Sequence, residues 1–83
     1  MSRYYIDTDD GLLFIHDDED WEFASAGAAR DLAQRALREM AEQRVPDGER
    51  RKFTSSVRDR KGTTLYVATL TLAGEWKVPP HAA

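Results

Sequence analysis

The side chains best equipped for chemistry stand together near the N-terminus, where His16 is followed by the four consecutive acids Asp17-Asp18-Glu19-Asp20. Carboxylate oxygens are the ligands that calcium and magnesium prefer. Consecutive carboxylates, however, lack the alternate spacing of an EF-hand loop, and neighbouring side chains in an extended segment point apart. We therefore expect a solvated acidic loop here, with no bound metal and no other cofactor.

Residues for acid–base or nucleophilic catalysis are present but scattered. The two histidines stand at positions 16 and 81, and no serine lies near either of them in a signature spacing. Asp17 and Asp18 could share a proton only in an apolar pocket, which nothing in the sequence predicts. We therefore expect a protein without enzymatic activity.

A basic segment spans residues 49–61. A hairpin would gather its bases near the two ends of one strand, where they could bind phosphates. Phe53 is the one aromatic residue among them, and the chain as a whole carries a net charge of −3. Residues 1–22 hold eight acids, so the two oppositely charged ends can neutralise each other within the fold or across a dimer. We expect ordinary solvated bases rather than a nucleic-acid site. The candidate basic patch consists of Arg50, Arg51, Lys52, Arg58, Arg60 and Lys61.

The length of 83 residues predicts one domain with a thin core, since a chain this short buries roughly 60 to 65% of its unfolded surface. There is no cysteine to form a disulfide. Small domains without such links often gain the missing burial from a partner, so we expect a homodimer. The N-terminus lacks the apolar stretch of a signal peptide, and nothing approaches the length of a membrane span, so we expect a cytoplasmic protein with no membrane partner.

One long helical pattern occupies residues 24–44. Its apolar side chains recur every three or four residues, which predicts a helix with one face on a sheet. Ser25 is the expected N-cap, and Pro46-Asp47-Gly48 is expected to end the helix. The apolar stripe consists of Ala29, Leu32, Ala33, Ala36, Leu37, Met40 and Ala41.

Two pairs of strand-like runs flank the helix. Residues 3–7 and 12–15 surround the turn Asp9-Asp10-Gly11, and residues 52–58 and 63–72 surround a turn that ends in Gly62. The predicted fold is α+β: a ββαββ two-layer sandwich, with a mainly antiparallel sheet and the helix on one face. Residues 1–76 form the single domain, and residues 77–83 are expected to be a flexible C-terminal tail.

The run at 63–72 is apolar on both of its faces, whereas one helix can cover only one face of a sheet. Either the strand is central with both faces covered, or its uncovered face is a dimer surface. The interface candidates are Tyr5, Tyr66, Leu70 and Leu72, which would equally be core residues if the two faces are reversed. Trp21 and Trp76 each lie just outside a predicted element, as interface anchors or as lids on the core.

A set of short motifs resembles a family of small bacterial domains of unknown function, whose pattern reads RYFFD, DG, DDEG, EAAR, LPDG, VRD, G. The likeness runs from about residue 3 to 72. Asp20 stands where the family has glycine, and Gly27 where an acid usually opens the helix. The resemblance implies a fold but no activity. The motifs that carry it are Arg3-Tyr4-Tyr5-Ile6-Asp7, Asp10-Gly11, Asp17-Asp18-Glu19, Ala28-Ala29-Arg30, Met40-Ala41, Pro46-Asp47-Gly48, Val57-Arg58-Asp59 and Gly62.

A more distant likeness, in layout alone, is to HicB-type antitoxin domains, in which a strand pair with an acidic turn precedes an Ala/Leu-rich helix. It implies an alternative function, a small acidic protein that binds a basic partner. Our interpretation of the sequence is a non-enzymatic interaction module, homodimeric through its sheet. The alternatives are this HicB-like or regulatory role and weak nucleic-acid binding through residues 50–61.

Overall fold

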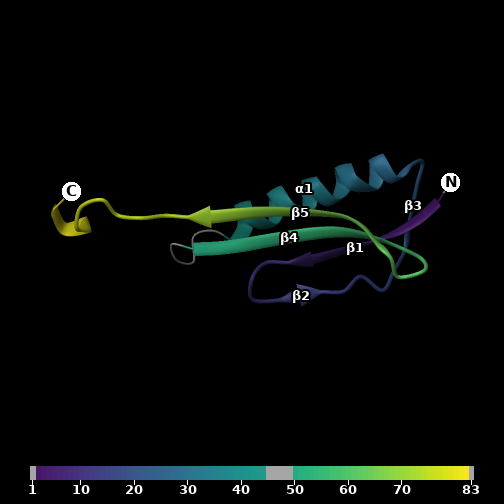
Figure 1. The fold of residues 1–83 in the computed structure, drawn as a ribbon, viewed down its shortest axis with the longest axis horizontal. Helices are drawn as coiled ribbons and strands as arrows, with labels where there is room; N and C mark the ends of the chain where they lie inside the picture. Colours follow the sequence, from purple (N-terminus) through teal and green to yellow (C-terminus); the bar gives the residue numbers. More distant parts are fainter. Residues whose placement is uncertain (1, 45–49, 83) are drawn as a thin grey trace.

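The computed structural model describes residues 2–44 and 50–82 and has the predicted α+β fold, with one more strand than expected (Figure 1). One long helix packs against a five-stranded antiparallel sheet. The predicted helix stop at Pro46-Asp47-Gly48 lies outside the described residues. In chain order the elements are β1 (Ser2–Asp9), β2 (Phe14–Ile15), β3 (Trp21–Phe23), α1 (Ala26–Arg44), β4 (Arg50–Asp59), β5 (Thr64–Ala73) and a short 3₁₀ turn (Pro80–Ala82).

The helix α1 begins at Ala26, directly after the predicted N-cap Ser25. The Ser25 hydroxyl accepts a hydrogen bond from the Ala28 N–H at 3.1 Å, which satisfies one of the free amides of the first turn. The predicted stripe faces the sheet, with Ala29 and Ala33 fully buried and Leu37 nearly so. Small side chains on this stripe let the helix axis approach the strands closely.

Glycines close both hairpin turns in the left-handed region, with φ of +94° at Gly11 and +90° at Gly62. Aspartate side chains stabilise the same turns by accepting hydrogen bonds from backbone N–H groups. Asp10 accepts hydrogen bonds from the N–H groups of residues 12 and 13, and Asp59 accepts from those of residues 61 and 63. Local chemistry therefore fixes both turns as predicted.

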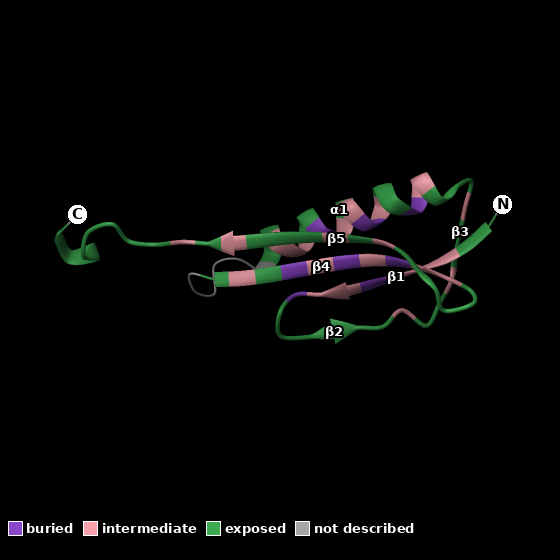
Figure 2. Ribbon diagram, in the orientation of Figure 1, coloured by how far each residue is buried: buried purple, intermediate pink, exposed green. Residues whose placement is uncertain are grey.

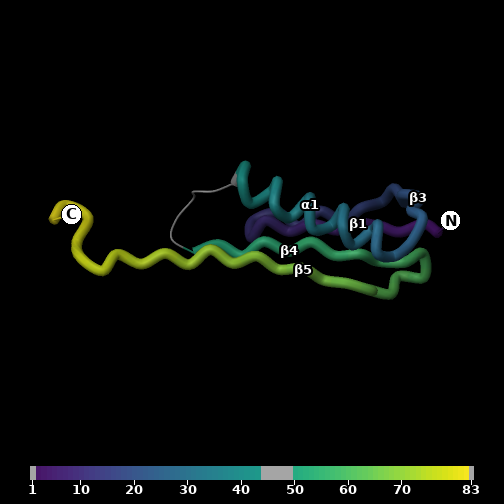
Figure 3. Tube along the Cα trace, turned by 90° about the horizontal axis from the view of Figure 1, so that it is seen from above, coloured from purple at the N-terminus to yellow at the C-terminus, as the bar shows by residue number. Residues whose placement is uncertain are grey.

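The strand order across the sheet is β2-β1-β4-β5, and β3 pairs with β1 beside β2. The first strand thus lies between β4 on one side and two short strands on the other. Residues 2–4 of β1 pair with β3, whereas residues 8 and 9 pair with β2. Among the described residues, β5 pairs with β4 alone, and Figure 3 shows it running along one border of the body.

The core lies between α1 and β4. Phe53, Ser55 and Val57 of β4 are the largest fully buried side chains, and Figure 2 shows burial concentrated on β4 and on the inner side of the helix. The hydroxyl of Ser55 has no hydrogen-bond partner within the described residues. Residues packed around Val57 are only partly buried, so the core is thin. They are Tyr4, Ile6, Phe23 and Tyr66.

Beyond Ala73 the chain leaves the body and extends past the end of β5 (Figures 1 and 3). Trp76 and Val78, the large apolar side chains of this extension, are 57% and 51% exposed. The extension makes the molecule long and narrow, with principal extents of 57 × 20 × 18 Å. Its apolar groups are therefore available to another molecule.

Candidate functional site

Three of the four predicted interface residues lie on the helix side of the sheet, which is the second of the two arrangements that the sequence left open. Leu70 pairs with the buried Phe53, and residues that pair directly in an antiparallel sheet point to the same face. Tyr66 packs beside Val57, and its hydroxyl lies 2.7 Å from Nε2 of Gln34 on the helix. Leu72, two residues beyond Leu70, shares this face.

Tyr5 lies on the opposite face, where its ring receives the Arg58 guanidinium at 4.3 Å from the ring centre. This open face is more polar than expected, because the residues that alternate with the core positions of β1 and β4 are mostly charged or hydroxylic. On the same face of β5, Val67 pairs with Ser56 and is exposed, so the apolar character of the open face is confined to this strand. The residues that alternate with these core positions are Tyr5, Asp7, Asp9, Lys52, Thr54, Ser56 and Arg58.

The strand β5 exposes apolar side chains on both of its faces. From Thr64 to Ala73 the strand has no charged residue and no proline. Val67 and Leu70 are 54% and 43% exposed, although they point to opposite faces. A bulge opposite Val57 and Arg58 leaves Leu65 without a partner in the register, so the regular part of the strand begins at Tyr66.

The opposite edge of the sheet is short and interrupted. It consists of β2, with two residues, and β3, with three, separated by the acidic loop at residues 16–20. The side chain of Asp17 bridges the gap, since its carboxylate accepts hydrogen bonds from the Ile6 N–H at 3.2 Å and the Trp21 Nε1–H at 3.0 Å. The carboxylate thus takes the place of a strand neighbour for β1 at Ile6.

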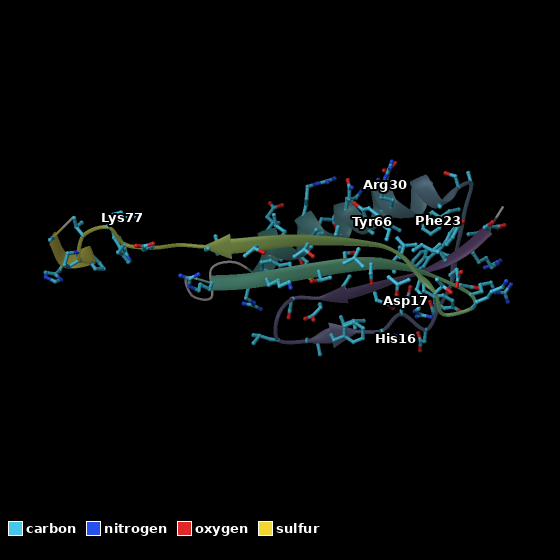
Figure 4. All side chains as sticks on the ribbon, in the orientation of Figure 1. His16, Asp17, Phe23, Arg30, Tyr66 and Lys77 are labelled. Atoms are coloured by element: carbon cyan, nitrogen blue, oxygen red, sulfur yellow. The ribbon has the colours of Figure 1, made fainter. Side chains whose placement is uncertain are left out.

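The acidic loop is therefore organised by hydrogen bonds to the protein. The second oxygen of Asp17 accepts from the Glu19 N–H at 3.1 Å, and Figure 4 shows Asp17 beside the β2 connection. In the part of the chain that the structure describes, no three acidic, histidine or cysteine side chains form a group that could hold a metal ion. Sequence reasoning missed this structural role, because the donors come from another strand and from Trp21.

A nearly buried ion pair joins the loop to the open face of the sheet. Arg58 donates from Nε to Asp7 at 3.0 Å and from Nη2 to the Asp17 carbonyl at 2.8 Å. Burial alone would raise the pKa of Asp7, but the hydrogen bond from Arg58, the Asp17 N–H and the nearby positive charge outweigh it and lower the pKa. The same hydrogen bond from Arg58 to Asp7 raises the pKa of Arg58. Asp7 is therefore ionised when the protein is folded at neutral pH.

The candidate basic patch is divided by ion pairs with the acidic N-terminal half. Arg51 lies against Asp10 and donates from Nε to its carbonyl at 2.7 Å, and Arg58 is bound to Asp7. Arg60 lies 3.7 Å from Asp20. The structure confirms that the two charged ends of the chain neutralise each other within the fold. Arg50, Lys52 and Lys61 are exposed and lie at different places along the hairpin.

A shallow apolar groove runs between the helix and the short edge. It encloses about 360 Å³ and is lined by Ile6, Ile15, Asp17, Trp21, Leu32 and Ala36. An adjoining hollow shares Ile15 and Ala36 and adds acidic Asp10 and Glu39 to the lining. Asp10 is buried and lies against Arg51, so Glu39 is the exposed acidic residue of this lining. No helix among the described residues combines the length and apolar composition that a membrane crossing requires.

The fold defines a small α+β domain whose sheet has one short, interrupted edge and one long, uncharged edge. The chain belongs to the family described as Domain of unknown function (DUF6894), whose profile matches residues 3–71. This confirms, at that level, the resemblance drawn from the motifs. No curated protein and no solved structure matches the chain. The likeness to HicB-type antitoxin domains stays a prediction.

Proposed function

We propose that this protein is a non-enzymatic interaction module that forms a homodimer by pairing the β5 edges of two copies. The observation that carries the proposal is the long, uncharged and proline-free edge of β5. Natural sheets protect such edges with charges, prolines or short strands, because an open edge pairs readily with another strand. Two identical edges related by a two-fold axis are self-complementary, so a second copy is the simplest partner.

The exposed surface supports a need for a partner. The chain has 5957 Å² of accessible surface. A compact monomer of 9.4 kDa is expected to have about 5,000 Å². Three of the exposed large apolar side chains, Leu65, Val67 and Leu70, belong to β5 itself. Joining two copies at this strand would cover apolar side chains and satisfy backbone groups in the same step.

The opposite edge is a poorer candidate for self-association. Its two strands offer two and three residues for pairing, and the acidic loop between them would bring like charges together in a symmetric dimer. The charge-free β5 edge carries no such penalty. The two edges thus favour different partners.

A charge placed on the β5 edge tests the proposal. Thr69→Lys adds a lysine at the proposed interface, and we expect it to weaken dimerisation at least tenfold in size-exclusion chromatography with light scattering. Thr54→Lys is the matched control, because Thr54 is the direct neighbour of Thr69 on the inner strand β4 and points to the same face. A monomer at all concentrations in the unmodified protein, or equal effects of the two substitutions, would reject the proposal.

Binding of a basic partner is the second candidate function, and the apolar groove beside α1, with the exposed Glu39 in the adjoining hollow, favours it. The exposed Ile15 lies on the groove wall. We expect Ile15→Glu to abolish capture of a basic partner from the native host while Thr69→Lys leaves capture intact. Capture that is insensitive to Ile15→Glu and to moderate salt would reject this candidate.

Nucleic-acid binding is a third candidate function, and the ion pairs argue against it. Arg51 and Arg58 are both held by acids of the same chain, so their charges are compensated where a phosphate would bind. We expect no mobility shift of DNA or RNA at low salt. A complex that dissociates steeply as salt rises would revive this candidate.

A further inference from the structure

We infer that the two-fold axis of the β5 dimer passes beside Leu70 and that Trp76 of each copy fills a hollow in the other. The inference rests on the proposed function. It concerns the C-terminal extension, which leaves its own domain with Trp76 exposed. The partner copy would therefore complete a site that each copy leaves empty.

The register follows from the sequence of the edge. Pairing is regular only beyond the bulge at Leu65, and the next charge along the chain is Glu75. The regular and uncharged stretch thus runs from Tyr66 to Gly74, and its midpoint is Leu70. A two-fold axis at a residue also keeps side chains of the same face opposite one another, as antiparallel pairing requires.

This register places large side chains against small ones on the helix face. Tyr66 would face the partner's Gly74, Leu72 would face the partner's Ala68, and the two copies of Leu70 would meet at the axis. On the open face, Thr69 would face the partner's Thr71, a pairing of hydroxylic β-branched residues that stabilises antiparallel sheets. Alternation of large and small side chains is what close packing across such a pair needs.

The same register carries Trp76 beyond Tyr66 of the partner. Trp76 is an even number of residues from Tyr66 and Leu72, so an extended segment would place its indole on the same face as theirs, the helix face. A hollow of about 210 Å³ lies there, lined by Ala26, Gly27, Arg30, Val57, Leu65 and Tyr66. Metabolite pockets span roughly 300–1,000 Å³, so this hollow has the scale of a single large side chain.

The lining of the hollow suits an indole. Gly27 leaves the floor open, since a Cβ added there would meet only the Ser25 hydroxyl at 3.6 Å and the Arg30 guanidinium at 3.9 Å. Arg30 lies on the same side of the molecule as Tyr66 (Figure 4). A guanidinium stacked on the face of a tryptophan adds a favourable cation–π contact to the apolar burial.

The hollow is out of reach of the chain's own Trp76. Tyr66 and Trp76 are ten residues apart along an extended segment, which at roughly 3.3 Å per residue separates them by about 33 Å. Figure 1 shows the extension continuing away from the N-terminal end of α1. Only a tail that arrives antiparallel, from a second copy, brings its tryptophan to this place.

Tryptophan fluorescence can test the inference directly, because the chain has two tryptophans. In Trp21→Phe the emission reports Trp76 alone. We expect a shift to shorter wavelength as concentration rises through the dimer dissociation constant, and no shift when Thr69→Lys is added as the control. We also expect Trp76→Ala to weaken dimerisation at least about tenfold, the effect of a tryptophan anchor.

The outcomes separate the two claims. A dimer in which the Trp76 emission stays that of an exposed indole overturns the tail inference and leaves the β5 dimer standing. A monomer at all concentrations overturns both. If Trp21→Phe does not fold, the difference in emission between the unmodified protein and Trp76→Phe gives the same information.

Discussion

The two edges of this sheet differ in how far their outward-facing backbone groups are hydrogen-bonded within the described residues. At the short edge, β2 and β3 cover parts of β1, and the Asp17 carboxylate hydrogen-bonds the Ile6 N–H between them. At the long edge, β5 extends over ten residues without a charge or a proline. Nothing comparable to Asp17 protects β5 in the described residues. One edge is closed by pairing within the monomer, whereas in the dimer that we propose the other edge receives a second strand.

The apolar side chains differ between the edges as well. At the short edge they line a groove between the helix and the strands, next to a hollow that contains the exposed Glu39. At the long edge they lie on an uncharged strand, which suits an identical copy. In the proposed dimer, a domain with so thin a core would gain stability at the β5 edge and leave the groove at the short edge open.

Removal of Asp7 is expected to have the largest effect on the closed edge. Asp7→Ala leaves the Arg58 guanidinium buried without its carboxylate, and we expect the free energy of unfolding to fall by about 3–5 kcal/mol. Urea denaturation at fixed protein concentration measures it. The double variant Asp7→Ala/Arg58→Met is the control, because an apolar pair of similar size often restores stability. A loss below about 1 kcal/mol in the single variant would mean that the ion pair does not hold this edge.

Asp17→Ala is expected to have a smaller effect. It leaves the Ile6 N–H and the Trp21 Nε1–H without their acceptor, and we expect a loss of about 1–3 kcal/mol in unfolding free energy. Asp18→Ala is the matched control, because Asp18 is the exposed neighbour in the same loop, and we expect no measurable change from it. Equal losses in the two variants would contradict the bridging role of Asp17.

Acid should weaken the closed edge gradually. Because the pKa of Asp7 is lowered in the folded protein, its contribution is complete above the unfolded value of 3.8 and is lost as pH falls through the folded value. One carboxyl can change the unfolding free energy by at most about 1.4 kcal/mol per pH unit. We expect denaturation curves between pH 5 and 2 to show that the unfolding free energy of Asp7→Asn falls less steeply with decreasing pH than that of the unmodified protein. An equal pH dependence of the unfolding free energy in the two proteins would show that Asp7 does not contribute to acid denaturation.

The sequence predicts what neighbouring residues determine. Ser25 caps the helix, the glycines close both turns, and the alanine stripe faces the sheet, because each depends on contacts within a few residues. The strand β3 was missed, since three residues form a strand only when β1 lies beside them. Which face of β5 meets the helix is left open by the sequence, because apolar residues occupy both faces of this strand.

The candidate site depends on strand order, which the sequence does not encode locally. Tyr66, Leu70 and Leu72 were correctly chosen as members of an apolar strand, but only the arrangement of strands places that strand at an edge. The roles of Asp7 and Arg58 depend on a pairing between residues 51 positions apart. The one sequence signal of this pairing is the uneven charge distribution, with acids concentrated near the N-terminus and bases in residues 49–61.

The pairing of Asp7 with Arg58 and of Asp10 with Arg51 sets an order of events during synthesis. Both acids leave the ribosome well before their arginines, so the first hairpin and the helix emerge while the sheet still lacks its central strand. The acidic N-terminal half cannot form these two ion pairs until β4 has been synthesised. Folding is completed when the last hairpin arrives and places β4 next to β1.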